Sequence, residues 1–61
     1  MEVKIYDNDD NTELIINDWY DDNLLPVTIS NKEIGLRAQI NMTKKDVYHL
    51  MLHLQNRLNE L

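Results

Sequence analysis

The spacing of apolar residues along the chain changes once, close to residue 43. Between Ile34 and Met42 every even position is apolar, and the positions between them are occupied by Gly, Arg, Gln and Asn. Strict alternation of this kind is typical of a strand with one buried face. From Val47 onward apolar residues recur at spacings of three and four, which is the period of an α-helix. The chain is therefore expected to end with a strand at about 34–42 followed by a helix.

The start of that helix is marked by the segment Thr43-Lys44-Lys45-Asp46. The Thr43 hydroxyl can accept from an amide of the first turn, and the Asp46 carboxylate can accept from the Thr43 backbone, as in a capping box. We expect the helix at about 43–60, with a length of roughly 27 Å. Its apolar stripe comprises Val47, Leu50, Met51, Leu54, Leu58 and Leu61.

Three earlier segments rich in β-forming residues predict strands at about 2–6, 13–20 and 25–30. Segments rich in Asp and Asn separate them, and these residues favour turns because their side chains hydrogen-bond the nearby backbone. Pro26 has no amide to donate, so it belongs at the start of its strand or at a sheet edge. The run Leu14-Ile15-Ile16 places apolar residues at both odd and even positions, so the spacing does not decide which face of the second strand points inward.

This order of elements predicts an α+β fold, β-β-β-β-α, in a single small domain that covers residues 1–61. Short connections favour sheet neighbours that are also neighbours in sequence. We therefore expect a four-stranded antiparallel meander sheet with one C-terminal helix packed on one face. A chain of 61 residues without cysteine has no disulfide to stabilise it. Its stability then rests on a small core or on oligomerisation.

Charge is distributed unevenly along the chain. Residues 1–33 carry nine acidic residues and two lysines, a net charge of −7, whereas residues 34–61 have a net charge of +2. This balance argues against direct binding to nucleic acid and indicates a protein partner with a basic surface. No apolar run suits a secretory signal or a membrane span. We expect a cytoplasmic protein with no membrane partner.

Neither catalytic nor cofactor-binding residues are indicated, and we expect that the protein is not an enzyme. Ser30 is the only serine, and no histidine lies near it in the sequence. Nucleophilic catalysis needs a serine activated by a base in a pocket, and one sheet with one helix leaves little interior for such a pocket. The single glycine, Gly35, excludes a glycine-rich phosphate loop.

Two short patterns resemble the spacing of metal ligands. Asp7-x-Asp9-x-Asn11 matches the opening of an EF-hand calcium loop, but Thr12 stands where that loop requires glycine. His49 and His53 share one side of the helix, and a further ligand is offered only by the same helix. An ordinary acidic turn and a solvated helix face are the better interpretations, so no metal site is predicted.

Two acidic clusters are candidates for binding a partner. Trp19 and Tyr20 lie between Asp18 and the pair Asp21-Asp22, and large aromatic side chains ringed by charge are typical of binding hot spots. The alternative is that Trp19 caps the small core. The predicted partner-binding residues are Asp7, Asp9, Asp10, Asp18, Trp19, Tyr20, Asp21 and Asp22. Successive turns of a meander lie at opposite ends, which argues against a single continuous patch.

In size, acidity and the clusters Asp7-Asn8-Asp9-Asp10 and Asp18-Trp19-Tyr20-Asp21-Asp22, the chain resembles the small acidic anti-defence proteins of phages, including anti-CRISPR and anti-restriction nucleic-acid mimics. The resemblance implies an inhibitor or adaptor whose carboxylates occupy the basic, nucleic-acid-binding surface of a target protein. If a phage encodes the chain, the cytoplasm in which it acts is that of the host cell. The alternative is a structural self-association module, whose acidity serves solubility only. Such a homodimer would form through a sheet edge or through Tyr48 and Leu52 on the helix.

Overall fold

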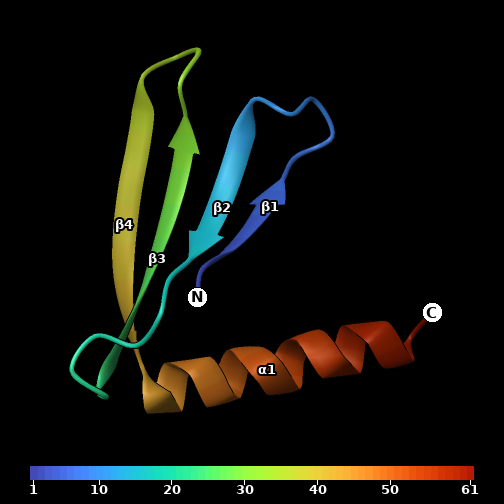
Figure 1. Cartoon of the computed structure of the whole chain (residues 1–61). Coiled ribbons are helices and arrows are strands. Elements are labelled where there is room, and N and C mark those ends of the chain that lie inside the picture. The colour runs from blue at the N-terminus through green and yellow to red at the C-terminus, as the bar shows by residue number, and fades with distance from the viewer.

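The computed structural model describes all 61 residues, which form four strands followed by one helix. The elements are β1 (Val3–Tyr6), β2 (Thr12–Ile16), β3 (Leu24–Asn31), β4 (Leu36–Thr43) and α1 (Lys44–Asn59). The strands form one antiparallel sheet in the order β1-β2-β3-β4 (Figure 1). The predicted α+β meander with a single C-terminal helix is confirmed.

The register of the strands divides the sheet into an apolar and a polar face. Val27 is paired with Ile16 on one side and with Ile40 on the other. Because side chains alternate along a strand, this row and those in step with it lie on one face. That apolar face contains Val3, Ile5, Leu14, Ile16, Leu25, Val27, Ile29, Leu36, Ala38, Ile40 and Met42. Ile15 points to the other face, so the second strand does send apolar side chains to both.

The polar face holds the only two buried residues of the chain, Thr28 and Ser30, which are 2% and 5% exposed. Both lie in β3, and Glu13 and Arg37 of the neighbouring strands flank Ser30. Every buried polar side-chain atom has a hydrogen-bond partner. No hydrophobic residue is buried, and the apolar layer between sheet and helix is only half-buried, at Leu14, Ile16, Leu25, Val27, Met42 and Val47.

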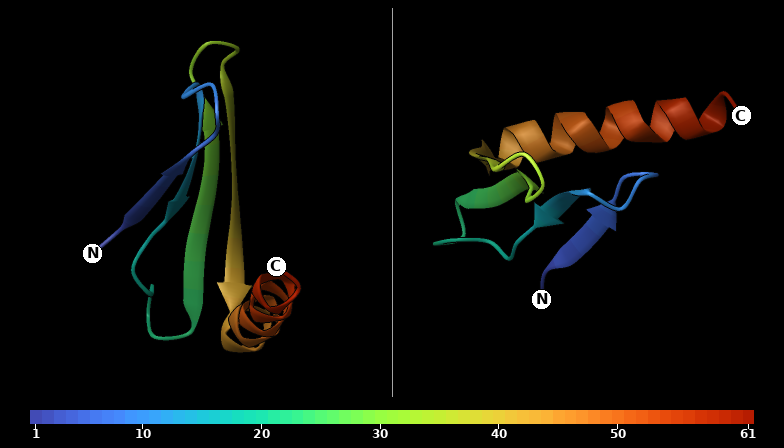
Figure 2. Two further views of the ribbon diagram at one scale, coloured as in Figure 1. Left: turned by 90° about the vertical axis from the view of Figure 1, so that its right-hand side faces the viewer. Right: turned by 90° about the horizontal axis from the view of Figure 1, so that it is seen from above.

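Helix α1 begins directly after β4 and lies beside the apolar face, at the end of the sheet where β4 finishes (Figures 1 and 2). Thr43 Oγ1 accepts from the Asp46 amide, and the Asp46 carboxylate accepts from the Thr43 amide, both at 3.2 Å. The predicted capping box is therefore present. The helix approaches only β3 and β4. Figure 2 shows that the sheet twists so that β1 and β2 lie away from it.

The second strand is shorter than the predicted 13–20 and ends at Ile16. Asn17 still donates to the Pro26 carbonyl at 3.1 Å, but proline has no amide to return the bond, and the ladder stops there. Asp21 and Asp22 then adopt left-handed backbone conformations, with φ of 60° and 57°, and reverse the chain. The predicted last strand, 34–42, is also displaced, because residues 34 and 35 belong to the preceding turn.

The helix itself matches the predicted range to within a residue at each end. Its 16 residues are too short and too polar for it to cross a membrane, and the chain has no other helix.

Candidate functional site

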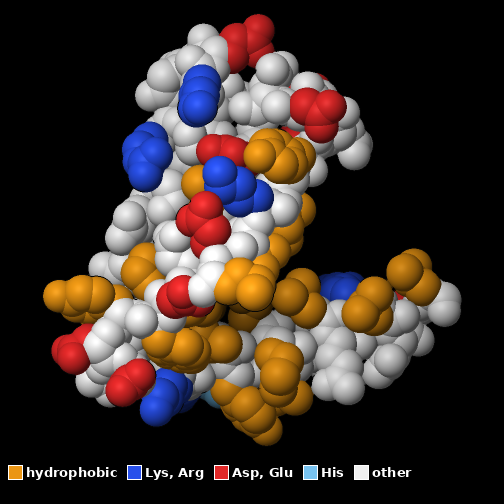
Figure 3. Space-filling view, in the orientation of Figure 1, with side chains coloured by type: hydrophobic (Ala, Val, Ile, Leu, Met, Phe, Trp, Pro, Cys, Tyr) orange, Lys and Arg blue, Asp and Glu red, His pale blue; other side chains and the backbone are white.

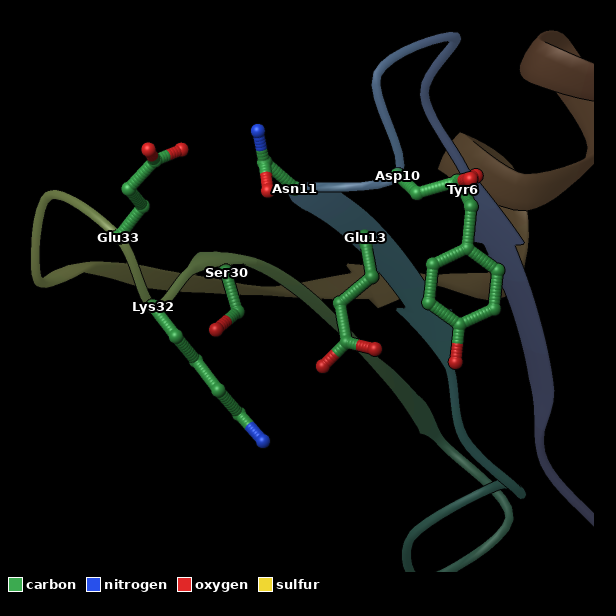
Figure 4. Close-up of a pocket in the computed structure, with 7 residues that line it drawn as sticks. All are labelled: Tyr6, Asp10, Asn11, Glu13, Ser30, Lys32 and Glu33. Carbon is green, nitrogen blue, oxygen red and sulfur yellow. The ribbon is translucent and has the colours of Figure 1, made fainter.

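The β1–β2 turn and the β3–β4 turn lie at the same end of the sheet (Figure 1). Between them, on the polar face, is a shallow hollow of about 310 Å³, which we call the acidic hollow. It is lined by Tyr6, Asp10, Asn11, Glu13, Ser30, Lys32 and Glu33 (Figure 4). The lining thus comes from three strands and both turns.

The floor of the acidic hollow is set by strand register. Tyr6 is paired with Glu13, and Glu13 is paired with Ser30, so the three side chains share one face. Figure 4 shows the Glu13 side chain between those of Ser30 and Tyr6, with Lys32 reaching toward the same side. Ser30 itself is buried, so the accessible groups are the Glu13 carboxylate and the Tyr6 ring.

The wall of the hollow on the β1–β2 side is held by the turn that follows Tyr6. The Asp10 amide donates to the Asp7 carbonyl at 2.9 Å, and the Asn11 amide donates to Asp9 Oδ1 at 2.9 Å. Asp10 has a left-handed φ of 61°, a conformation that Asp and Asn tolerate better than most residues. On the other side, the Glu33 amide donates to Asn31 Oδ1 at 3.0 Å.

The charge of this end is largely uncompensated. The lining has three carboxylates and one lysine, two further carboxylates, Asp7 and Asp9, lie in the adjoining turn, and Arg37 lies beside Ser30 on the same face, so five carboxylates stand against two cations. None of these groups forms an ion pair. The ion pairs of the chain are elsewhere, between the amino terminus and Asp18, Lys4 and Glu2, and Arg57 and Glu60. The acidic hollow therefore presents a negative, concave surface to solvent.

The second predicted cluster, Asp18 to Asp22, lies in the β2–β3 loop at the opposite end of the sheet (Figure 1). Asp18 is paired with the amino terminus. Trp19 and Tyr20 are 41% and 68% exposed, so neither ring is enclosed in a core. The predicted partner-binding residues therefore form two separate groups, with Asp7, Asp9 and Asp10 at one end and the rest at the other.

Sequence reasoning missed three of the charged groups that meet at the acidic hollow, namely Glu13, Lys32 and Glu33. The available signal was the meander itself, because its first and third turns must lie at the same end. The meander does not predict that Glu13 joins them. The face on which Glu13 lies depends on the register of β2, where apolar residues occupy both odd and even positions.

A second surface lies on the other side of the sheet, between the apolar face and α1. It is an open groove of about 870 Å³, which we call the apolar groove. It is lined by Leu14, Ile16, Leu25, Val27, Ile40, Met42, Val47, Leu50, Met51, Leu54, Gln55 and Leu58. No ionisable residue is among them. Hydrophobic side chains also show along the helix in the space-filling view (Figure 3).

The helical stripe predicted from spacing lines the apolar groove, except for Leu61, which follows the helix and is fully exposed. Tyr48 and Leu52, the residues proposed for self-association, lie outside the groove lining. Tyr48 instead has its ring 6.1 Å from that of His49. Their role in association stays a prediction.

No group of three or more His, Cys, Asp or Glu side chains is arranged to hold a metal ion. The acidic hollow offers carboxylates, an aromatic ring and one amine at an open surface, which suits the binding of a cationic side chain. No family model, curated protein or solved structure matches the chain.

Proposed function

We propose that this chain is an acidic protein-binding inhibitor or adaptor that occupies the basic, nucleic-acid-binding surface of a target protein. The supporting observation is that five carboxylates lie at one end of the sheet and that none of them forms an ion pair with a cation of the chain. They are Asp7, Asp9, Asp10, Glu13 and Glu33. Carboxylates left unpaired in this way are free to meet the cations of a partner.

In this proposal, a Lys or Arg side chain of the target enters the acidic hollow. The carboxylates of Asp10 and Glu13 accept its charge-assisted hydrogen bonds, and the Tyr6 ring, which is largely exposed, offers an aromatic surface for the cation. The bound carboxylates then stand where phosphates would stand, and their negative field repels nucleic acid from the same surface.

The second cluster, with Asp21 and Asp22, serves as a separate contact. It is separated from the acidic hollow by the length of β3, whose eight residues span about 26 Å. A target that contacts both ends must therefore carry basic residues over a comparable distance. The exposed ring of Tyr20 lies beside these aspartates and supplies apolar contact area there.

The test begins with an affinity pull-down from the native host, followed by mass spectrometry, using the wild-type chain and the double variant Asp10→Asn/Glu13→Gln. We expect the wild type to capture a nucleic-acid-binding protein that the variant captures poorly. With that protein purified, we expect the variant to associate about tenfold more slowly at low salt, with a flatter dependence on salt.

The matched control is Asp21→Asn/Asp22→Asn, which removes two charges at the opposite end and retains the left-handed turn, because Asn tolerates that conformation. We expect this control to slow association less. Unchanged binding by Asp10→Asn/Glu13→Gln would show that the acidic hollow is not the binding surface.

A further inference from the structure

The apolar groove leaves the inward stripe of α1 open to water. Within it, Ile40 of the sheet is 61% exposed and Leu58 of the helix is 69% exposed. The cause is the direction of the helix, which approaches β3 and β4 but reaches neither β1 nor β2. Val3 and Ile5 of β1 therefore have no helix against their side of the sheet, although they belong to the apolar face.

The whole chain has too much surface for its mass. Its accessible area is 5231 Å², whereas a compact monomer of 7.3 kDa is expected to expose roughly 4,200 Å². Its radius of gyration is 13.1 Å, compared with roughly 10.5 Å for a compact domain of this length. The chain thus exposes about 1,000 Å² more than a compact monomer, and the exposed apolar side chains of the groove and of β1, such as Ile40, Leu58, Val3 and Ile5, contribute to this excess.

We propose that a second copy of this chain fills the apolar groove. The two copies are related by a two-fold axis, and the later turns of each helix cover the apolar side of β1 and β2 of the partner. Burial of about 1,000 Å² on each copy gives about 2,000 Å² in total, which is the size of a stable dimer interface.

Two observations favour a second copy over any other occupant. The two open surfaces are complementary in kind, because each chain supplies an apolar sheet side at β1 and β2 that its own helix does not reach and an amphipathic helix whose apolar stripe stays largely exposed. No charged residue lines the groove, so filling it buries no charge of the lining, although the net charge of −5 on each chain still gives a repulsion that salt screens. A small chain in which no hydrophobic residue is buried gains stability from a partner, and another copy is present wherever the chain is made.

The first experiment measures the mass and the stability of the full chain by sedimentation equilibrium and by thermal unfolding, from about 1 to about 100 μM. We expect a mass of twice 7.3 kDa and a midpoint of unfolding that rises with protein concentration. A single-chain mass at the highest concentration, with a midpoint that does not depend on concentration, overturns the proposal. A trimer or larger assembly also overturns it.

The second experiment tests the surface with introduced cysteines, since the chain has none. Ile5→Cys and Leu58→Cys are prepared as separate proteins, mixed and oxidised. Each protein carries a single cysteine, so a mixed disulfide joins two chains and reports that Ile5 of one copy approaches Leu58 of the other. We expect the mixed disulfide to form at least about tenfold faster than with His49→Cys, which lies on the polar side of the helix.

A matched pair of substitutions completes the test. Leu54→Asn, within the groove, is expected to weaken the dimer at least about tenfold, whereas His53→Asn on the polar side is expected to leave it unchanged. If Leu54→Asn does not fold, the concentration dependence of the wild type still decides the question. The proposal is overturned if Ile5→Cys forms a disulfide with His49→Cys as fast as with Leu58→Cys. It is also overturned if Leu54→Asn folds and leaves the dimer affinity unchanged, because the interface then lies elsewhere. None of these outcomes depends on the function proposed for the acidic hollow.

Discussion

In the β3–β4 turn, the backbone conformation at Gly35 restricts which amino acids can occupy that position. Its φ is 68°, in the left-handed region where a β-carbon costs about 1 to 2 kcal/mol. No atom lies within 4 Å of the position that an added β-carbon would take. The restriction is therefore one of backbone conformation and not of space. Because this turn carries Lys32 and Glu33, its shape also positions one wall of the acidic hollow.

We predict that Gly35→Ala lowers the free energy of unfolding by about 1 kcal/mol, through backbone strain alone. Gly35→Asn is the matched control and is expected to cost less, because Asn adopts left-handed conformations more readily than Ala does. Urea unfolding at one fixed protein concentration measures both. Equal losses for the two variants would mean that strain at φ of 68° is not the cause.

At the scale of elements, the capping box formed by Thr43 and Asp46 fixes the point where β4 ends and α1 begins. The pKa of Asp46 is lowered from its usual 3.8, first by the hydrogen bond from the Thr43 backbone and then by that with the Thr43 side chain, with smaller contributions from His49 and Lys45. These bonds form only when the helix is folded. The ionised carboxylate therefore stabilises the folded chain.

The sign of the pH dependence follows from that lowered pKa. Between the folded and the unfolded pKa of Asp46, the unfolded chain binds more protons, so stability falls as the pH falls. The contribution of the cap is complete above about pH 3.8 and is lost as the pH drops through the lower, folded value.

We predict that Asp46→Asn reduces the loss of thermal stability between about pH 5 and about pH 2, measured by circular dichroism of the helix against the wild type. Glu60→Gln removes one carboxylate at the other end of the helix without touching the capping box, and should retain most of the wild-type difference, because its ion pair with Arg57 is exposed and contributes little. A pH profile of Asp46→Asn that matches the wild type would contradict the role of the capping box.

The elements also mark what the sequence could and could not predict. The alternation before Met42 and the capping residues Thr43 and Asp46 predicted the last strand and the helix, because each pattern depends only on near neighbours. The end of β2 could not be predicted in this way, since Pro26 of the adjacent strand stops its ladder. The apolar stripe predicted that this side of the helix packs against another apolar surface. The spacing of the stripe does not specify which surface that is.

The same distinction applies to the acidic hollow. Asp10 was recognised as part of an acidic turn, but Glu33 belongs to another hairpin and meets it only because the sheet places both turns at one end. Asp21 and Asp22 looked equivalent to Asp9 and Asp10 in composition, yet the topology separates them by the length of β3. Charge composition therefore predicted the character of the surface, and strand order determined its location.

At the scale of the whole molecule, the two proposed interactions respond to salt in opposite directions. Association of two chains that each carry a charge of −5 is opposed by repulsion, which salt screens. Binding of the acidic hollow to a basic target is driven by attraction, which salt screens as well.

We predict that raising sodium chloride from about 0.05 to about 0.5 M tightens the dimer several-fold and weakens target binding at least about tenfold. Sedimentation equilibrium measures the change in dimer affinity. The rates of association and dissociation with the captured protein measure the change in target binding. A dimer that weakens with salt would indicate an interface held by ion pairs, which the uncharged lining of the apolar groove does not provide.

The acidic hollow and the apolar groove lie on opposite faces of the sheet, and this placement has a consequence for any pair of chains. In the proposed dimer the two copies meet through the apolar groove, so the acidic hollows, which lie on the opposite face of the sheet, remain on the outside. The pair is then bivalent, with one cation-binding surface on each flank. On a target that repeats its basic surface, as a protein filament or a symmetric oligomer does, the second contact becomes intramolecular, and avidity adds to a weak individual affinity.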